Sequence, residues 1–217
     1  MDTEWKLGCP VWITENGSHN AETKRRRVLK RLVRKDYTKP PSAELVKSWH
    51  KEMFDGIAPH SDYVGQFRDK ERTSYCLQDY EVVVGDIPGT DSSRVLLEVD
   101  AFFKDFNAKL NSLESSFPTD GSRPPTFDEV SGVVELTAWA HGEWIQIHPF
   151  ANGNGRTARL LANYVLIRFG FGPALTIRPR PDQPYGAAAR ASMKERDHRL
   201  MEVVIWELLA ESYGLQE

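Results

Sequence analysis

The sequence contains no long apolar run. Its 217 residues include no stretch of about 18 consecutive apolar side chains, the length that a helix needs to cross a membrane. Residues 1–9 hold no apolar core of the kind that directs secretion, and there is neither an internal repeat nor a low-complexity segment. The composition therefore predicts one globular domain of ordinary size, located in the cytoplasm and without a membrane partner.

Cysteine is scarce as well. The two cysteines, Cys9 and Cys76, have neither the close spacing of a metal site nor the number that a disulfide framework requires. We therefore predict reduced thiols, which are usual in cytosolic proteins.

The net charge of −3 hides one strongly basic block. Residues 24–35 carry eight Lys and Arg side chains and no acid, a composition that also occurs in nucleic-acid-binding segments. Within this block apolar residues recur at helical spacing, which is typical of an amphipathic helix with a solvated basic face. We favour the helix and predict no nucleic-acid partner. The apolar positions are Val28, Leu29, Leu32 and Val33.

Helical periodicity covers most of the chain, and the fold is predicted to be mainly α. Turn formers and the short apolar run at residues 81–84 predict a loop with one small β-hairpin in residues 58–89. Two helix starts are clear, because Ser42 can cap one helix and Thr126 with Glu129 forms a capping box for another. The predicted helices cover residues 20–35, 43–54, 92–113, 127–147, 154–169 and 185–213.

The chemistry is concentrated between two of these helices. Gly153 and Gly155 leave backbone N–H groups accessible where a new helix starts, and a helix N-terminus attracts anions. Arg156 and Arg159 are three residues apart, so they share a helix face and can bind two phosphates. His148 titrates near neutrality and can act as a base. Together these residues indicate phosphoryl or nucleotidyl transfer. Two other histidines, His50 and His141, are predicted to be structural.

The stretch from His148 to Arg159 resembles the signature of the Fic family, H-P-F-x-[D/E]-G-N-G-R-x-x-R, with one departure: Asn152 stands where the family has Asp or Glu. The resemblance extends over about residues 42–205. It implies a Fic-type helical bundle with a β-hairpin flap beside the active loop. It also implies two parts, a candidate regulatory segment at 1–41, with the basic helix, and a Fic domain at 42–217.

The resemblance implies a protein adenylyltransferase, which transfers AMP from ATP to a Ser, Thr or Tyr hydroxyl of a target protein. His148 would be the base, and Phe150 would anchor the loop in the core. The flap residues 82–84, three valines, would hold the target as an added strand. The implied phosphate-binding residues are Gly153, Asn154, Gly155, Arg156 and Arg159.

The substitution at Asn152 bears on Mg²⁺, the implied cofactor. The family's carboxylate helps to hold the metal, whereas an amide offers only a neutral oxygen, so a weaker metal site is expected. Three alternatives stay open: slower catalysis, transfer of another group, and a regulator that binds nucleotide without catalysis. The Doc branch, which transfers phosphate, carries Lys at the position of Gly155, which argues against that branch.

Regulation is also open. Many Fic proteins carry an inhibitory motif, [S/T]-x-x-x-E-[G/N], whose Glu pairs with the second arginine of the signature. Glu22 and Glu15 each fit this motif in part. An inhibitory segment of the chain and a small inhibitory partner protein are both compatible with the sequence.

Overall fold

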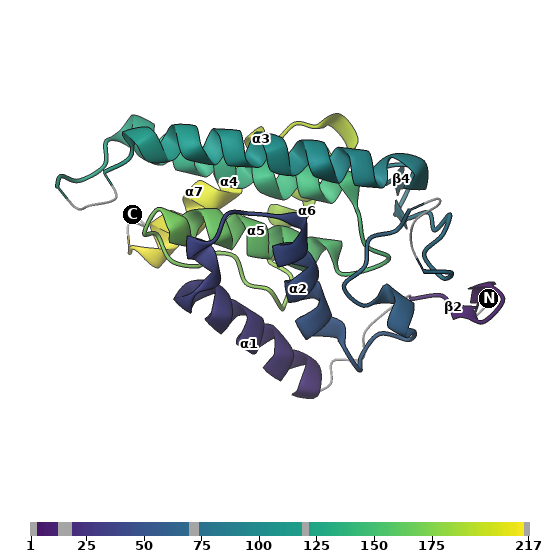
Figure 1. Cartoon of the computed structure of the whole chain (residues 1–217). Coiled ribbons are helices and arrows are strands. Elements are labelled where there is room, and N and C mark those ends of the chain that lie inside the picture. The colour runs from purple at the N-terminus through teal and green to yellow at the C-terminus, as the bar shows by residue number, and fades with distance from the viewer. Residues whose placement is uncertain (1–3, 13–18, 70–73, 119–121, 215–217) are drawn as a thin grey trace.

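The computed structural model describes residues 4–12, 19–69, 74–118 and 122–214. Its described part contains seven α-helices and two short hairpins (Figure 1). The helices are α1 His19–Arg34, α2 Ala43–Phe54, α3 Val95–Ser116, α4 Phe127–Ile147, α5 Asn154–Arg168, α6 Tyr185–Glu195 and α7 Arg199–Ser212. Strands β1 Glu4–Lys6 and β2 Cys9–Pro10 pair antiparallel, as do β3 Val83–Val84 and β4 Ile87–Pro88. Short 3₁₀ turns cover Asp36–Thr38, Ser61–Tyr63 and Ser92–Arg94.

Helix α4 is the centre of the bundle, and α3, α5, α6 and α7 pack around it. Its long apolar surface explains this position, because residues on all sides of the helix from Val133 to Ile147 are buried. The predicted capping box is present: Glu129 N–H donates to Thr126 Oγ1, and the Glu129 carboxylate accepts from Thr126 N–H at 2.7 Å. Ser42 caps α2 by accepting from Leu45 N–H. The mainly α fold is confirmed.

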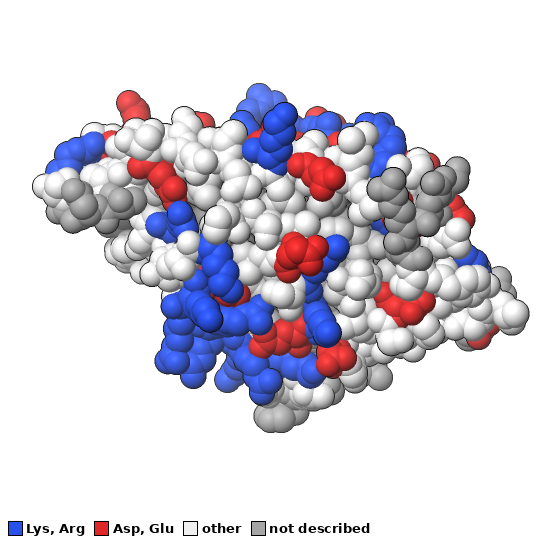
Figure 2. Space-filling view, in the orientation of Figure 1, with Lys and Arg blue, Asp and Glu red and all other residues white. Residues whose placement is uncertain are grey.

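Helix α1 packs against α2 and α5 through Val28 and Leu32, which are both fully buried. Its basic side chains gather on one face of the molecule (Figure 2). Arg31 turns inward from this cluster and forms ion pairs with Asp36 and Glu52. The predicted amphipathic helix is therefore present. No helix among the described residues is long and apolar enough to cross a membrane.

Three features differ from the sequence predictions. The first hairpin, β1–β2, was not predicted, because its strands are too short for an alternating pattern to show. The predicted helix 185–213 is two helices, since Arg196 takes a left-handed conformation (φ 53°) that ends α6. Finally, Cys9 and Cys76 form a disulfide. The prediction of reduced thiols is wrong for this pair. Cysteine usage therefore no longer supports the predicted cytoplasmic location.

Candidate active site

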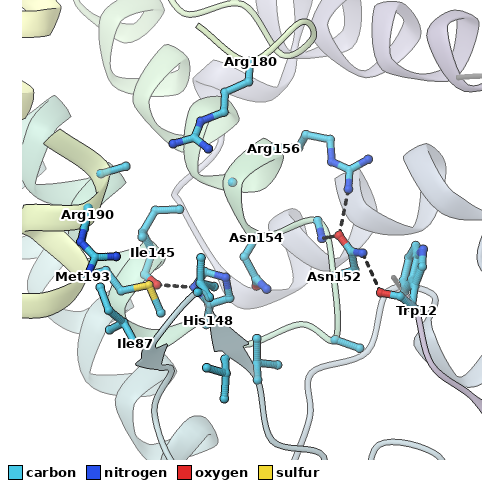
Figure 3. A pocket seen from close by; sticks show the side chains of 18 of the residues that line it. Trp12, Ile87, Ile145, His148, Asn152, Asn154, Arg156, Arg180, Arg190 and Met193 are labelled. Carbon is cyan, nitrogen blue, oxygen red and sulfur yellow. Dashed lines mark hydrogen bonds between the residues drawn. The ribbon is translucent and has the colours of Figure 1, made fainter. Parts of the chain in front are cut away.

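A cavity of about 910 Å³ lies where α4 ends and α5 begins (Figure 3). This volume is large enough for a nucleotide. The flap hairpin β3–β4, the N-terminal residues Val11 and Trp12, and the segment 178–193 complete its wall. The structure thus brings together all the predicted phosphate-binding residues, the predicted base and the predicted flap.

His148 caps α4 and faces this cavity. Its left-handed backbone (φ 51°) ends the helix and turns the imidazole back so that Nδ1 donates to the Ile145 carbonyl. The proton is therefore on Nδ1, and Nε2 keeps a lone pair at the cavity. Burial lowers the pKa of His148 to about 4, with the nearby Arg68 charge acting in the same direction and the Ile145 hydrogen bond opposing both. The ring is thus neutral at pH 7, rather than half-protonated near neutrality as the sequence suggested.

The loop after His148 is closed by the side chain of Asn154. Its Oδ1 accepts from Phe150 N–H at 2.9 Å, and its Nδ2 donates to the Phe150 carbonyl at 2.8 Å. Phe150 is fully buried, as predicted. The first-turn N–H groups of Asn154 and Gly155 have no carbonyl partner inside α5, since a helix leaves its first donors unpaired. Both residues line the cavity, and their N–H groups can therefore donate to an anion there.

Gly153 is required at the start of α5 for two reasons. Its φ of +84° lies in the left-handed region, and a Cβ there would lie 2.6 Å from the Phe54 ring. His50 supports the same turn from behind. Its Nδ1 accepts from Gly65 N–H at 3.0 Å, so Nε2 carries the proton and donates to the Asn152 carbonyl at 3.1 Å. Burial lowers the pKa of His50 to about 3, which keeps this arrangement neutral.

The two signature arginines leave α5 in different directions. Arg156 Nη2 donates to Asn152 Oδ1 at 3.1 Å, and its guanidinium lies 4.5 Å from the centre of the Phe54 ring. Arg159 Nη1 donates to Tyr185 Oη and Nη2 to the Ile177 carbonyl, both at 2.9 Å. Both side chains are nearly buried and line the cavity. Their charges are therefore held in place before a ligand binds.

Tyr185 connects Arg159 to His141. Burial lowers the pKa of His141 to about 3, so its ring is neutral. Since Tyr185 Oη accepts from Arg159, its own proton is directed to His141 Nε2 at 2.8 Å. The sequence assigned His141 only a structural role, and the structure shows that it contacts Tyr185, which in turn contacts Arg159, a predicted phosphate-binding residue. Tyr185 itself was missed, because it lies 26 residues after Arg159 in sequence.

Three further arginines line the cavity: Arg178, Arg180 and Arg190. Among the described residues, Glu81 is the only carboxylate in the wall, so the cavity is strongly positive and suited to a polyphosphate. These arginines come from the segment after α5, and nothing in their spacing relates them to the signature. Proximity in the fold alone identifies them.

Arg68 fixes the flap relative to the active loop. This fully buried guanidinium donates to the His148 carbonyl at 2.8 Å and to the Ile147 carbonyl. On the flap side it donates to the carbonyls of Tyr80 and Thr90 and to the Glu81 carboxylate. The backbone N–H of Arg68 also donates to the Pro149 carbonyl. One side chain therefore joins both ends of the flap to the base.

The flap lies across the cavity from α5. In its hairpin Val83 pairs with Pro88 and Val84 with Ile87, with the turn at Gly85 and Asp86. Val82, Val83 and Val84 all line the cavity, and Val83 is 62% exposed. β3 has one partner strand among the described residues, so its other edge is available to a further strand.

Asn152 does not present an oxygen for a metal. Its Oδ1 accepts from Gly153 N–H at 2.6 Å and from Arg156 Nη2, while its Nδ2 donates to the Trp12 carbonyl at 3.1 Å (Figure 3). The nearest carboxylate in the wall, Glu81, is bonded to Arg68 and to Ser92 N–H. These donors do not fit a protein-held Mg²⁺, which favours carboxylate and water oxygens.

Of the two inhibitory candidates, Glu22 lies within the described residues. Glu22 lies in the first turn of α1, is paired with Arg26 at 2.5 Å and does not line the cavity. Glu15 lies outside the described residues. A separate cluster, His60, Asp62 and Cys76, has metal-like proximity, but its cysteine belongs to the disulfide and is not a ligand.

Comparison with known proteins agrees with this architecture. The profile of the Fic/DOC family matches residues 40–166, more than half of the chain. The protein adenylyltransferase Fic of Nematostella vectensis is 49% identical over 47 residues, which cover 22% of this chain and 11% of that protein. The aligned part is thus a small fraction of that relative's length.

Two solved structures share the fold over most of the chain. A Fic domain containing signaling protein from Bacteroides thetaiotaomicron has a TM-score of 0.64 and 17% sequence identity to this chain. The superposition covers 93% of this chain and 73% of the Bacteroides chain. The BepC protein of Bartonella tribocorum, with bound AMPPNP, has a TM-score of 0.56 and 14% identity, covering 88% and 85%. The helical bundle, the flap and the family match lead to one conclusion: this chain belongs to the Fic/DOC family.

Proposed function

We propose that the chain is a protein adenylyltransferase that transfers AMP from ATP to a Ser, Thr or Tyr hydroxyl of a target protein. The observation that carries the proposal is the geometry of His148. Its Nε2 lone pair faces a cavity lined by the α5 N-terminus and by two ordered arginines, and a flap edge lies on the opposite side. A base, an anion site and a strand edge in one cavity suit attack of a peptide hydroxyl on a bound nucleotide.

In the proposed reaction, Nε2 of His148 takes the proton of the target hydroxyl as its oxygen attacks the α-phosphorus of ATP. The bond from the α-phosphorus to the bridging oxygen breaks, and pyrophosphate leaves. The N–H groups of Asn154 and Gly155 and the charges of Arg156 and Arg159 would stabilise the phosphates. Mg²⁺ would arrive bound to ATP as part of the substrate, since the protein supplies no suitable ligand set.

The target would bind along β3 as an added strand, so its main chain would be held by residues 82–84 and its hydroxyl directed to His148. The relative named protein adenylyltransferase and the AMPPNP bound to BepC support nucleotide use by this fold. The second candidate is a regulator that binds nucleotide without efficient catalysis. The occupied oxygen of Asn152 favours that candidate, because no carboxylate replaces it near the phosphates.

The test uses ATP labelled at the α- or the γ-phosphate, an acceptor lysate and detection by mass spectrometry. Native protein should transfer the α-label, and His148→Ala should lower transfer by about 10²- to 10⁴-fold while ATP binding persists. His60→Ala is the matched control, since His60 does not line the cavity, and it should behave as native. Transfer of the γ-label would indicate phosphorylation instead, and ATP binding without transfer would favour the regulator.

Inhibition by residues 1–41 is also a proposal. Glu15→Gly should raise transfer if Glu15 opposes ATP binding at Arg159, and Glu22→Gly should leave transfer unchanged, because Glu22 is paired with Arg26 outside the cavity. Equal activity of both variants and native protein would leave a separate small partner as the inhibitor to be sought.

A further inference from the structure

The N-terminal segment, residues 4–12, forms part of the cavity wall. Trp12 is only 5% exposed, stacks on Tyr63 and packs edge-on against Phe54. Tyr63 in turn donates to the Pro10 carbonyl at 2.7 Å and accepts from Trp5 Nε1 at 3.2 Å. The segment is therefore folded against the same Phe54 ring that supports Arg156 and the Gly153 turn.

The Asn152 side chain forms a hydrogen bond between this wall and the predicted phosphate-binding loop. Its amide makes three hydrogen bonds: the oxygen accepts from Gly153 N–H and from Arg156, and the NH₂ group donates to the Trp12 carbonyl (Figure 3). A carboxylate at this position has no proton to donate, and its charge would face the Trp12 carbonyl oxygen. The contact therefore depends on the amide by which this chain departs from the Fic signature.

A covalent bond holds the segment at a second point. Cys9, three residues before Trp12, is joined to Cys76 across a sequence separation of 67 residues, and both sulfur-bearing side chains are buried. Cys76 lies just before the flap, and its N–H donates to the Asp62 carboxylate at 3.1 Å. The segment is thus fastened at Cys9 by the disulfide and at Trp12 by Asn152.

We propose that Asn152 is a positioning residue that joins the phosphate-binding loop to the N-terminal segment, and that nucleotide binding and the Cys9–Cys76 disulfide are therefore linked. The part of this proposal that concerns nucleotide binding rests on the proposed function. The linkage is reciprocal, since a coupling between two sites acts equally in both directions. Bound ATP protects the disulfide from reduction, and loss of the disulfide weakens ATP binding.

The first experiment needs no nucleotide. Dithiothreitol reduces the disulfide to two thiols and is itself oxidised to its cyclic disulfide, and maleimide labelling with mass spectrometry gives the rate. Because the bond is buried, reduction requires the segment to open. Asn152→Asp should accelerate reduction about tenfold, the effect of one lost hydrogen bond. Asn152→Ala, which adds no charge, should also accelerate reduction. This variant replaces Asn152→Asp in the test if the Asp variant does not fold.

Asn107→Asp is the matched control. Asn107 also joins two segments, because its Nδ2 donates to the Pro41 carbonyl at 3.1 Å, but it lies outside the cavity. Its reduction rate should equal that of native protein. Equal rates for native protein and both Asn152 variants would overturn the proposal, and so would an equal acceleration in the Asn107 control.

The second experiment adds ATP at saturation, as shown by calorimetric titration. ATP should slow reduction of the native disulfide several-fold and should protect the Asn152 variants less. ATP that binds to native protein without slowing reduction overturns the linkage. A complete absence of ATP binding would refute the proposed function. The rates of disulfide reduction without nucleotide would still decide the role of Asn152.

Discussion

The protonation state of His148 can be measured directly in the free protein. The residue is 8% exposed, and burial lowers the pKa of its imidazole to about 4, with the Arg68 charge acting in the same direction. At pH 5.5 a group with this pKa is about 97% unprotonated, whereas a histidine with the ordinary pKa of about 6.5 would be about 9% unprotonated. The two cases differ roughly tenfold in the fraction of active base.

The assay is an NMR titration of the histidine ring signals between pH 3.5 and 8, with the His148 signals assigned by their loss in His148→Ala. We expect a midpoint near 4 in the free protein. Adding ATP should raise the midpoint, because phosphate charge close to the ring favours the imidazolium form. A midpoint near 6.5 in the free protein would refute the conclusion that burial in this cavity sets the protonation of the base.

Three further predictions concern packing, positioning and acid stability. Gly153→Ala should lower the free energy of unfolding, measured in urea, by about 2–4 kcal/mol, because it adds both left-handed strain and overlap with Phe54. The control is Gly170→Ala, since Gly170 has a φ of +86° and open space around it, and this change should cost only about 1–2 kcal/mol. Equal losses in the two variants would contradict the overlap with Phe54. Tyr185→Phe should weaken ATP binding roughly tenfold in calorimetry, because the Arg159 guanidinium loses one of its two hydrogen bonds. Unchanged affinity would show that Arg159 needs no support from Tyr185. Three buried histidines have folded-state pKa values below the unfolded value of about 6.5, because their neutral rings are buried. The folded state therefore has its full stability above about pH 6.5, and it loses stability as the pH falls toward 3 to 4 and these rings must be protonated. Between pH 7 and 5 each should lower the free energy of unfolding by about 2 kcal/mol, and a flat pH profile would contradict their burial as neutral rings. These residues are His50, His141 and His148.

The helices could be predicted because their signals are local. The capping residues Ser42 and Thr126 and the apolar periodicity of α4 lie within the elements they define. The break between α6 and α7 gave no such signal, because Arg196 takes a conformation usually left to glycine. The signature likewise marks the predicted base and the predicted phosphate-binding turn, which are contiguous in the chain and line one cavity.

The contacts that position these groups could not be predicted, since they join residues far apart in sequence. Trp12 meets Asn152 across 140 residues, and Arg68 meets His148 across 80. Two cysteines without a spacing pattern likewise gave no indication that they would pair. The substitution at Asn152 was visible, but its partner was not, so the sequence suggested a weakened metal ligand where the structure has an amide between two segments.

The way Arg68 holds the flap has a consequence for how relatives of this chain could acquire new targets. Both ends of the hairpin are fastened beside His148, at Glu81 and at Thr90, while its tip at Gly85 and Asp86 carries none of these bonds and instead makes an exposed ion pair between Asp86 and Arg190 at 2.8 Å. Side chains at the tip can therefore change without altering the distance from the strand edge to the imidazole. A change in hairpin length would instead displace the acceptor hydroxyl. If a target binds along β3 as proposed, substitutions at the tip can change which target is selected while the geometry at His148 is preserved.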